Sequence, residues 1–257
     1  DTANPTCVKV ARMAMDAGLW FHVADYGGGV YENLKRAFRE DTAHMPHCIF
    51  KLDGLSPAKF LASVDDALQR TGVDRIAIGQ ICGNPVGKEM AALADAMFEM
   101  QEMGVIGHYI MDVIYSYSPK VISAIESNLF AGYIFYYNVT EREVSDDADK
   151  LIEEKHVSVL GMRTFGGRDG GNYLTADPQN PRRQALDAWF LRSGCTSRVE
   201  FCVSFPLSIP HIRTTIGSTS TPRHLEAMIE AVQDPRPLSW EIVSGIQSLH
   251  KQWNANR

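Results

Sequence analysis

HVSVLGMRTFGG, residues 156–167, and HIRTTIGSTSTPR, residues 211–223, are the two segments that decide the fold. The first contains a short apolar run typical of a buried strand, the second is predicted to form another strand, and each continues into a loop that contains glycine. In the second segment Thr221 is placed to cap a helix whose first residue is Pro222. Free N–H groups at a helix start favour phosphate, so the turn at Gly217 is either an anion site or a plain structural turn.

Strand runs alternate with helical patterns along the whole chain. Strands are predicted at 19–24, 48–53, 75–81, 108–114 and 132–138 and from about 157 and 212, and helices at 4–18, 31–39, 56–71, 87–103, 118–127, 145–155, 185–192, 196–205, 221–232 and 238–253. This alternation predicts the α/β class and, at this length, a single (β/α)8 TIM-barrel domain over residues 1–257. The chain starts with a helix, so the first barrel strand is expected to be lacking or replaced. The polar stretch 167–183 is long for a loop and is interpreted as a lid or a disordered segment.

Composition limits the classes of partner. The formal net charge of -6 and the absence of a basic run exclude a nucleic-acid surface, and no apolar run is long enough to span a membrane. Five scattered cysteines indicate reduced thiols, no metal site and a cytoplasmic setting. The expected partner is a small-molecule substrate, and a homo-oligomer is compatible with this composition.

In a barrel of parallel strands, catalytic residues are expected at the C-terminal ends of the strands. Polar or reactive residues stand at most of the predicted ends. They are His22, Asp25, Tyr26, Lys51, Asp53, Gln80, Cys82, Asp112, Tyr137, Asn138, Arg163 and the Gly217-Ser218 turn.

Five segments resemble the aldo/keto reductase family in the family's order, over nearly the whole chain. They are GLWFHVADYGGG followed by YENLKRAF, SPAKFLASVDDALQRTGVDRIAIGQI, SNLFAGYIFYYN, VSVLGMRTFGG and TTIGSTSTPRHLEAM. The resemblance implies a (β/α)8 barrel, binding of NADP(H), and carbonyl reduction by an Asp, Tyr, Lys and His set. In such a reaction the nicotinamide supplies hydride, an acid protonates the alkoxide, and a lysine lowers the pKa of the tyrosine.

Carried over one position at a time, the catalytic set is altered. Lys51 matches the family's lysine and Tyr26 its acid tyrosine, whereas the family's Asp falls on His22 and its His on Cys82. His22 is then a base or a group that orients the carbonyl, and a thiol at Cys82 is only a weak hydrogen-bond donor. The structural alternatives are that Tyr26 ends a strand, that Lys51 pairs with Asp25 or Asp53, that His22 is a satisfied core histidine, and that Cys82 is an inert buried thiol.

The same resemblance implies a set of cofactor-binding residues. Tyr137 is expected to stack on nicotinamide, Arg163 and Gly166 to lie at the pyrophosphate, and Gly217, Ser218, Thr219 and Arg223 at the adenosine phosphate. Core packing is the alternative for Tyr137, and a solvated surface position is the alternative for Arg223. The family's adenine-contacting residues fall on Ala227 and Met228, a departure from the pattern.

Three functions follow from these residues. The first is an NAD(P)(H)-dependent oxidoreductase, aldo/keto reductase-like, acting on a carbonyl or alcohol of a small molecule. The second is a cofactor-independent lyase, dehydratase or epimerase that uses His22, Tyr26 and Lys51 as acid/base groups. The third is a non-catalytic barrel that binds nucleotide at the Gly217 turn.

Overall fold

The computed structural model describes residues 3–25, 27, 29–83, 85, 87–113, 118–167 and 171–255. The chain divides into two compact units. The first contains residues 1–133 and 219–225, and the second contains residues 134–218 and 226–257. The single domain predicted over 1–257 stays a prediction.

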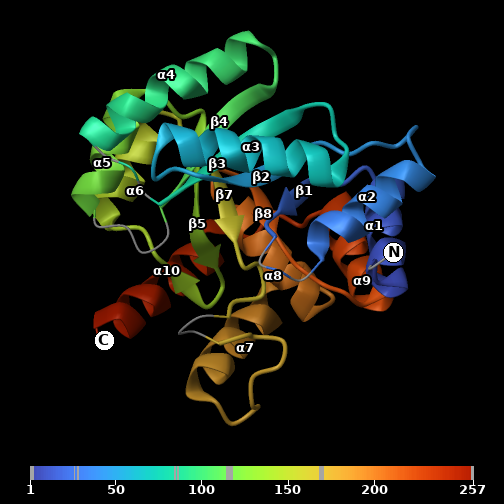
Figure 1. Cartoon of the computed structure of the whole chain (residues 1–257). Coiled ribbons are helices and arrows are strands. Elements are labelled where there is room, and N and C mark those ends of the chain that lie inside the picture. The colour runs from blue at the N-terminus through green and yellow to red at the C-terminus, as the bar shows by residue number, and fades with distance from the viewer. Residues whose placement is uncertain are drawn as a thin grey trace. The chain divides into compact units, whose positions relative to one another are not determined.

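Four neighbouring strands form the sheet of the first unit: β1 (Phe21–Val23), β2 (Cys48–Asp53), β3 (Ile76–Cys82) and β4 (Ile106–Asp112). The β1–β2, β2–β3 and β3–β4 pairs are all parallel. The helices of this unit are α1 (Pro5–Asp16), α2 (Val30–Glu40), α3 (Pro57–Thr71), α4 (Lys88–Glu102) and α5 (Ser118–Ser127), with α3 against β2 and α4 against β4 (Figure 1). The predicted alternation of parallel strands and helices is confirmed.

Local signals explain where these helices begin and end. Asn4 caps α1 by accepting from the backbone N–H groups of Thr6 and Cys7. Ser56 caps α3 by accepting from Lys59, and α3 ends at Gly72, whose φ of 78° is a left-handed conformation that glycine adopts without strain. The core between sheet and helices is apolar, and Phe50, Phe60 and Ile76 are fully buried in it.

The second unit contains most of β5 (Gly132–Asn138), together with β6 (Glu141–Arg142), β7 (Ser158–Met162) and β8 (Ile212–Ile216). In the sheet β7 lies between β5 and β8, the β7–β8 pair is parallel, and β6 pairs antiparallel with β5. Its helices are α6 (Asp146–Glu154), α7 (Pro181–Ser193), α8 (Arg198–Leu207) and α10 (Trp240–Ala255), and α9 (Pro222–Gln233) begins in the first unit and continues in the second. The strand β6 was not predicted because two residues carry no periodicity.

The polar stretch 167–183 contains a buried anchor. Tyr173 is 1% exposed and donates its hydroxyl to Asp187 of α7 at 2.6 Å. Helix α7 starts at Pro181, earlier than predicted, because Asn180 caps it by accepting from Arg182 and Arg183. Tyr173 therefore anchors its part of this stretch to α7, and residues 168–170 lie outside the described residues. Among the described residues, no helix combines the length and the apolar character that crossing a bilayer requires.

Candidate active site

Polar side chains from three strands of the first unit meet on one face of its sheet. Lys51 of β2 pairs in register with Gln80 of β3, and His22 of β1 reaches Gln80 across the intervening β2. Side chains alternate between the two faces of a strand, so a contact that bridges β2 requires His22 and Gln80 to lie on the same face. Gln80 also reaches Asp112 at the end of β4.

Two successive hydrogen bonds connect His22 to Gln80 and Gln80 to Asp112. The Nε2 of His22 lies 2.5 Å from the Oε1 of Gln80, and the Nε2 of Gln80 donates to the Oδ2 of Asp112 at 2.9 Å. Gln80 is 0% exposed, so both ends of its amide depend on these protein partners. Cys82 lies at the edge of the group, with its Sγ 3.9 Å from the same Asp112 oxygen.

Burial and charge fix the protonation states of this group. Burial lowers the pKa of His22 to about 4, and the positive charge of Lys51 acts in the same direction. Burial raises the pKa of the Cys82 thiol to about 12, and the charge of Asp112 adds to that effect. At neutral pH the imidazole is therefore uncharged and the sulfur is a thiol rather than a thiolate, so the inert-thiol interpretation of Cys82 is the one that fits.

The loop after β1 is held by a different set of charges. Asp25 forms an ion pair with Arg70 of α3 and accepts from the backbone N–H of Gly27 at 3.0 Å. Arg70 also bonds Glu32 at 2.8 Å. Asp25 is thus a partner of Arg70. The predicted acid, Tyr26, lies outside the described residues.

Tyr137 does not present a free ring face. It is 0% exposed, packs with Phe205 and His211, and accepts a hydrogen bond from Gln247 at 2.8 Å. Burial raises the pKa of its phenol to about 12. The core-packing alternative fits Tyr137, and stacking on nicotinamide from this position is not compatible with its burial.

Arg163 follows β7 and is exposed. Its guanidinium donates to the carbonyl oxygen of Gly167 at 2.6 Å and covers the ring of Tyr136 at 4.6 Å from the centroid. Its φ of 57° is unusual for a residue other than glycine. At Gly166 a Cβ would stand 2.3 Å from the Oγ1 of Thr140, so this glycine allows the loop to pack closely.

The segment after β8 is partly covered. A Cβ at Gly217 would stand 2.3 Å from the Cε of Met228, so the end of the Met228 side chain lies on the Gly217 backbone. Thr219 accepts from the backbone N–H of Thr221 at 3.0 Å, while Ser218 and Arg223 are exposed. The exposed side chains of Ser218 and Arg223 are suited to binding phosphate. The backbone of Gly217 is less suited, because the end of the Met228 side chain lies on it.

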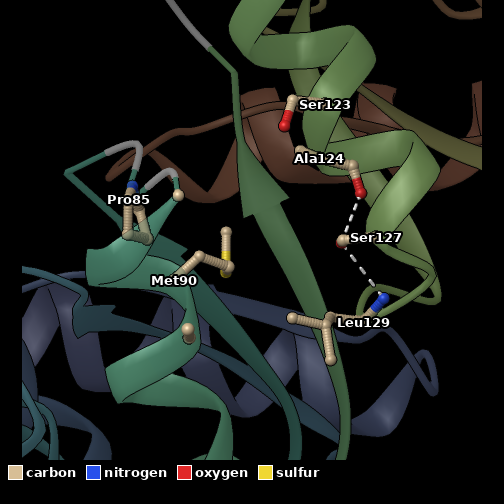
Figure 2. A pocket seen from close by; sticks show the side chains of 8 residues that line it. Pro85, Met90, Ser123, Ala124, Ser127 and Leu129 are labelled. Atoms are coloured by element: carbon tan, nitrogen blue, oxygen red, sulfur yellow. Dashed lines mark hydrogen bonds between the residues drawn. The ribbon is translucent and has the colours of Figure 1, made fainter.

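A cavity of about 270 Å³ lies between α4 and α5 in the first unit (Figure 2). Its lining residues are Pro85, Gly87, Met90, Ala91, Ser123, Ala124, Ser127 and Leu129. Ser127 is hydrogen-bonded to the carbonyl oxygen of Ala124 and to the N–H of Leu129. Among the residues that the structure describes, this lining contains no charged side chain and none of the predicted site residues.

Sequence reasoning noted Gln80 and Asp112 as strand ends but gave them no role. It placed the family's His on Cys82, whereas the side chain that faces His22 is Gln80. The sequence does carry a signal for these two residues. Each is a polar residue near the end of an otherwise largely apolar strand, IAIGQIC for Gln80 and IGHYIMD for Asp112.

Solved structures with a similar fold agree on one family. An aldo-keto reductase from Bacillus halodurans in its apo form is 21% identical, with a TM-score of 0.71 over 94% of this chain and 85% of that one. An aldose reductase from Giardia lamblia is 15% identical, with a TM-score of 0.72 over 98% of this chain and 90% of that one. An aldo-keto reductase from Klebsiella pneumoniae, in complex with NADP and acetate, is 15% identical, with a TM-score of 0.73 over 95% of this chain and 85% of that one.

No protein-family model and no curated protein matches the chain. The structural likeness nevertheless covers nearly all of it. The chain has the aldo/keto reductase fold, a (β/α)8 barrel of the α/β class, so the resemblance and the fold class predicted from the sequence motifs are confirmed.

Proposed function

We propose that this chain is an NAD(P)(H)-dependent oxidoreductase of the aldo/keto reductase kind, acting on a carbonyl or alcohol group of a small molecule. The observation that carries the proposal is the hydrogen-bonded group of half-buried His22, buried Gln80 and half-buried Asp112, beside Lys51, on one face of parallel strands. Buried polar groups of this kind are costly in a core and concentrate at functional sites. Fold alone does not define a function, and this group of side chains supports the proposal beyond the fold.

The hydrogen-bond donors in the loops after β7 and β8 are suited to the phosphates of a dinucleotide. Arg163, Ser218 and Arg223 are exposed, and Arg163 keeps further N–H donors after its bond to Gly167. We assign Arg163 to the pyrophosphate and Ser218, Thr219 and Arg223 to the adenosine phosphate. The nicotinamide would supply or take the hydride. Tyr137 and Gly217 are not part of this assignment, because the first is buried and the second is covered by Met228.

The chain's own residues would bind the substrate and handle its proton. Tyr26 is proposed as the acid that protonates the reduced oxygen, and Lys51 as the charge that lowers the pKa of that phenol. His22 is uncharged and contacts the substrate beside them. Cys82 has no role in proton transfer, since its thiol pKa is raised to about 12.

The test is binding followed by turnover. NADPH titrated into the purified chain is expected to raise its melting temperature, and addition of an aldehyde is expected to oxidise the NADPH. Lys51→Met should lower turnover at least tenfold with binding retained, whereas the matched charge removal Lys59→Met, at an exposed position of α3, should not. Absence of binding by both NADPH and NADH would overturn the proposal.

Two observations favour a second function. The side chain of Met228 on Gly217 and the burial of Tyr137 reduce the space for a dinucleotide in the second unit. The second candidate is a cofactor-independent lyase, dehydratase or epimerase that uses His22, Tyr26 and Lys51. Loss of activity in Lys51→Met without any binding of NADPH would favour it.

A further inference from the structure

Helices α7 and α10 of the second unit lie side by side and run in opposite directions. Three contacts join them along their length: Arg192 with Glu241, Trp189 with Gly245, and Arg182 with Trp253. The first is an ion pair. In the second, a Cβ on the glycine would stand 2.2 Å from the indole ring, and in the third the guanidinium lies 5.0 Å from the ring centroid. As the residue numbers fall along α7 they rise along α10, so the helices are antiparallel.

Two large apolar side chains of these helices are exposed to solvent. Leu191 is 80% exposed and Trp240 is 67% exposed. Each comes one residue before a member of the ion pair between the helices, Arg192 in α7 and Glu241 in α10. One residue along an α-helix turns a side chain by about 100°. Because the helices are antiparallel, the two rotations bring Leu191 and Trp240 to the same side of the pair, where they share one face.

Small side chains lie beside these two residues. Ala188 is one turn before Leu191 and is exposed, and Ser244 is one turn after Trp240 and is half-buried. The hydroxyl of Ser244 donates to the carbonyl oxygen of Glu241 in its own helix at 3.2 Å, so a dry contact would not leave this hydroxyl unpaired. Six residues thus form one surface, the α7–α10 face: Ala188, Leu191, Arg192, Trp240, Glu241 and Ser244.

The charges of the α7–α10 face favour a second copy of the chain as its partner. Arg192 and Glu241 are 53% and 69% exposed, and their charges cancel. A strongly basic or acidic partner would meet no net charge here, whereas a two-fold axis through the face sets each Arg192 against the partner's Glu241. The chain as a whole has a formal net charge of -6, so two copies repel each other in most orientations, and a neutral face is where they can meet.

We propose that the α7–α10 face joins two copies of this chain in a two-fold symmetric dimer, with Leu191 and Trp240 at its centre. The same patch of both copies forms such a contact, and Trp and Arg are among the residues that most often carry the binding energy. The inference goes beyond the proposed function and does not depend on it, because the face contains none of the residues assigned to catalysis or to the cofactor.

The size of the face determines the strength of the dimer. Two neighbouring helices, each about 10 Å wide and about 20 Å long, offer roughly 400 Å². The dimer then buries about 800 Å² in total, less than the roughly 1,200 Å² at which stable complexes begin. We therefore expect a weak and reversible dimer with a dissociation constant in the micromolar range.

Sedimentation velocity of the purified chain from about 1 to about 500 μM measures this self-association. The weight-average sedimentation coefficient is expected to rise with concentration from the monomer value toward the dimer value. In Leu191→Ser/Trp240→Ser the dissociation constant should rise at least about tenfold, because both central side chains are lost. The matched control is Phe98→Ser, which removes a side chain that is 64% exposed on α4 and should leave the constant unchanged. Urea unfolding checks that both variants are folded, as expected for changes at exposed positions.

Two charge reversals test the symmetry of the contact. Arg192→Glu alone and Glu241→Arg alone each place like charges against each other in the dimer of that variant, so each should stay monomeric where the original chain dimerises. In an equimolar mixture of the two variants, the acids of one copy meet the arginines of the other. The dimer should therefore return in the mixture.

Three results would overturn the proposal. A chain that stays monomeric up to about 500 μM does not use the face for self-association. Dimerisation that persists in Leu191→Ser/Trp240→Ser, or that is lost in Phe98→Ser, places the contact elsewhere on the chain. A mixture of the two charge reversals that stays monomeric rejects the two-fold pairing of Arg192 with Glu241.

Discussion

The Nε2 of Gln80 lies 2.9 Å from the Oδ2 of Asp112, in a position where Gln80 is fully buried. This contact fixes the orientation of the amide, and the amide in turn fixes the hydrogen on His22. A neutral amide thus bridges the carboxylate and the imidazole.

Replacing that amide with an acid should create a pair of carboxylates. In Gln80→Glu the two acids cannot both be ionised at this distance, so the folded-state pKa of one is raised above its unfolded value. The unfolding free energy should then fall as pH rises from about 5 to 8, because the folded state keeps a proton that the unfolded state has lost. Urea unfolding at the two pH values measures this. Gln80→Met is the uncharged control, and an equal pH dependence in both variants would contradict the prediction.

Removing the charge of Lys51 should shift the titration of His22. The pKa of His22 is about 4 chiefly because of burial, and the charge of Lys51 lowers it further. In Lys51→Met the pKa should rise but remain below the ordinary value near 6.5, since burial is unchanged. NMR titration of the ring is the measurement. Lys59→Met, on the exposed side of α3, should leave the midpoint in place, and a midpoint at 6.5 in Lys51→Met would show that burial is not the main cause.

The loop before Tyr26 should depend on Arg70. The Asp25 side chain is 6% exposed, so Arg70→Met leaves a nearly buried carboxylate without its cation. The unfolding free energy should fall by about 1–3 kcal/mol, less than for a fully enclosed pair because Arg70 itself is 38% exposed. Urea unfolding checks this. Adding Asp25→Asn to Arg70→Met should recover much of the loss, whereas Arg36→Met, in an exposed pair with Glu40, should change little.

The sequence predicted the elements whose signals are local. Helix α3 begins after Ser56 and ends before Gly72 because a capping side chain and a left-handed glycine act within one turn. The fold class followed from the alternation of strands and helices, which repeats over the whole chain. The two-residue strand β6 was missed because its pairing with β5 is a contact of the folded hairpin and not a pattern in the sequence.

The candidate site could be predicted only as a set of strand ends. His22 and Lys51 were identified, but the choice between Gln80 and Cys82 depends on which face each side chain takes and which neighbour it meets across β2. Tyr137 shows the same limit. The sequence motif predicts an aromatic residue at the end of a strand. It does not predict that the hydroxyl of this residue contacts Gln247, which lies 110 residues further along the chain.

Acid should destabilise the protein through two neutral histidines. The folded-state pKa of His22 and of His250 is about 4, below the ordinary value, so the unfolded state binds more protons between about pH 4 and 6.5. Stability from these groups is present above pH 6.5 and is lost as pH falls toward 4, by at most about 3 kcal/mol for each. Urea unfolding from pH 7 to 4.5 should show this slope. His250→Leu should reduce it, the exposed His224→Gln should not, and an unchanged slope in His250→Leu would exclude that histidine as a cause.

Two glycine substitutions should differ in whether a second change can repair them. In Gly54→Ala the new Cβ would stand 2.3 Å from the carbonyl oxygen of Cys82, so the backbone at the end of β3 must move. In Gly217→Ala the obstacle at 2.3 Å is the Cε of Met228, the flexible end of a side chain. The expected losses of unfolding free energy are about 1–3 kcal/mol for Gly54→Ala and less than about 1 kcal/mol for Gly217→Ala.

A double-mutant cycle separates the two cases. Met228→Ala should relieve Gly217→Ala, because it removes the atom that the new methyl group meets. Cys82→Ala should not relieve Gly54→Ala, because the carbonyl oxygen of residue 82 remains. Urea unfolding of the six variants gives both coupling energies. Rescue of Gly54→Ala by Cys82→Ala would mean that the thiol, and not the strand backbone beside it, sets how closely the end of β2 approaches β3.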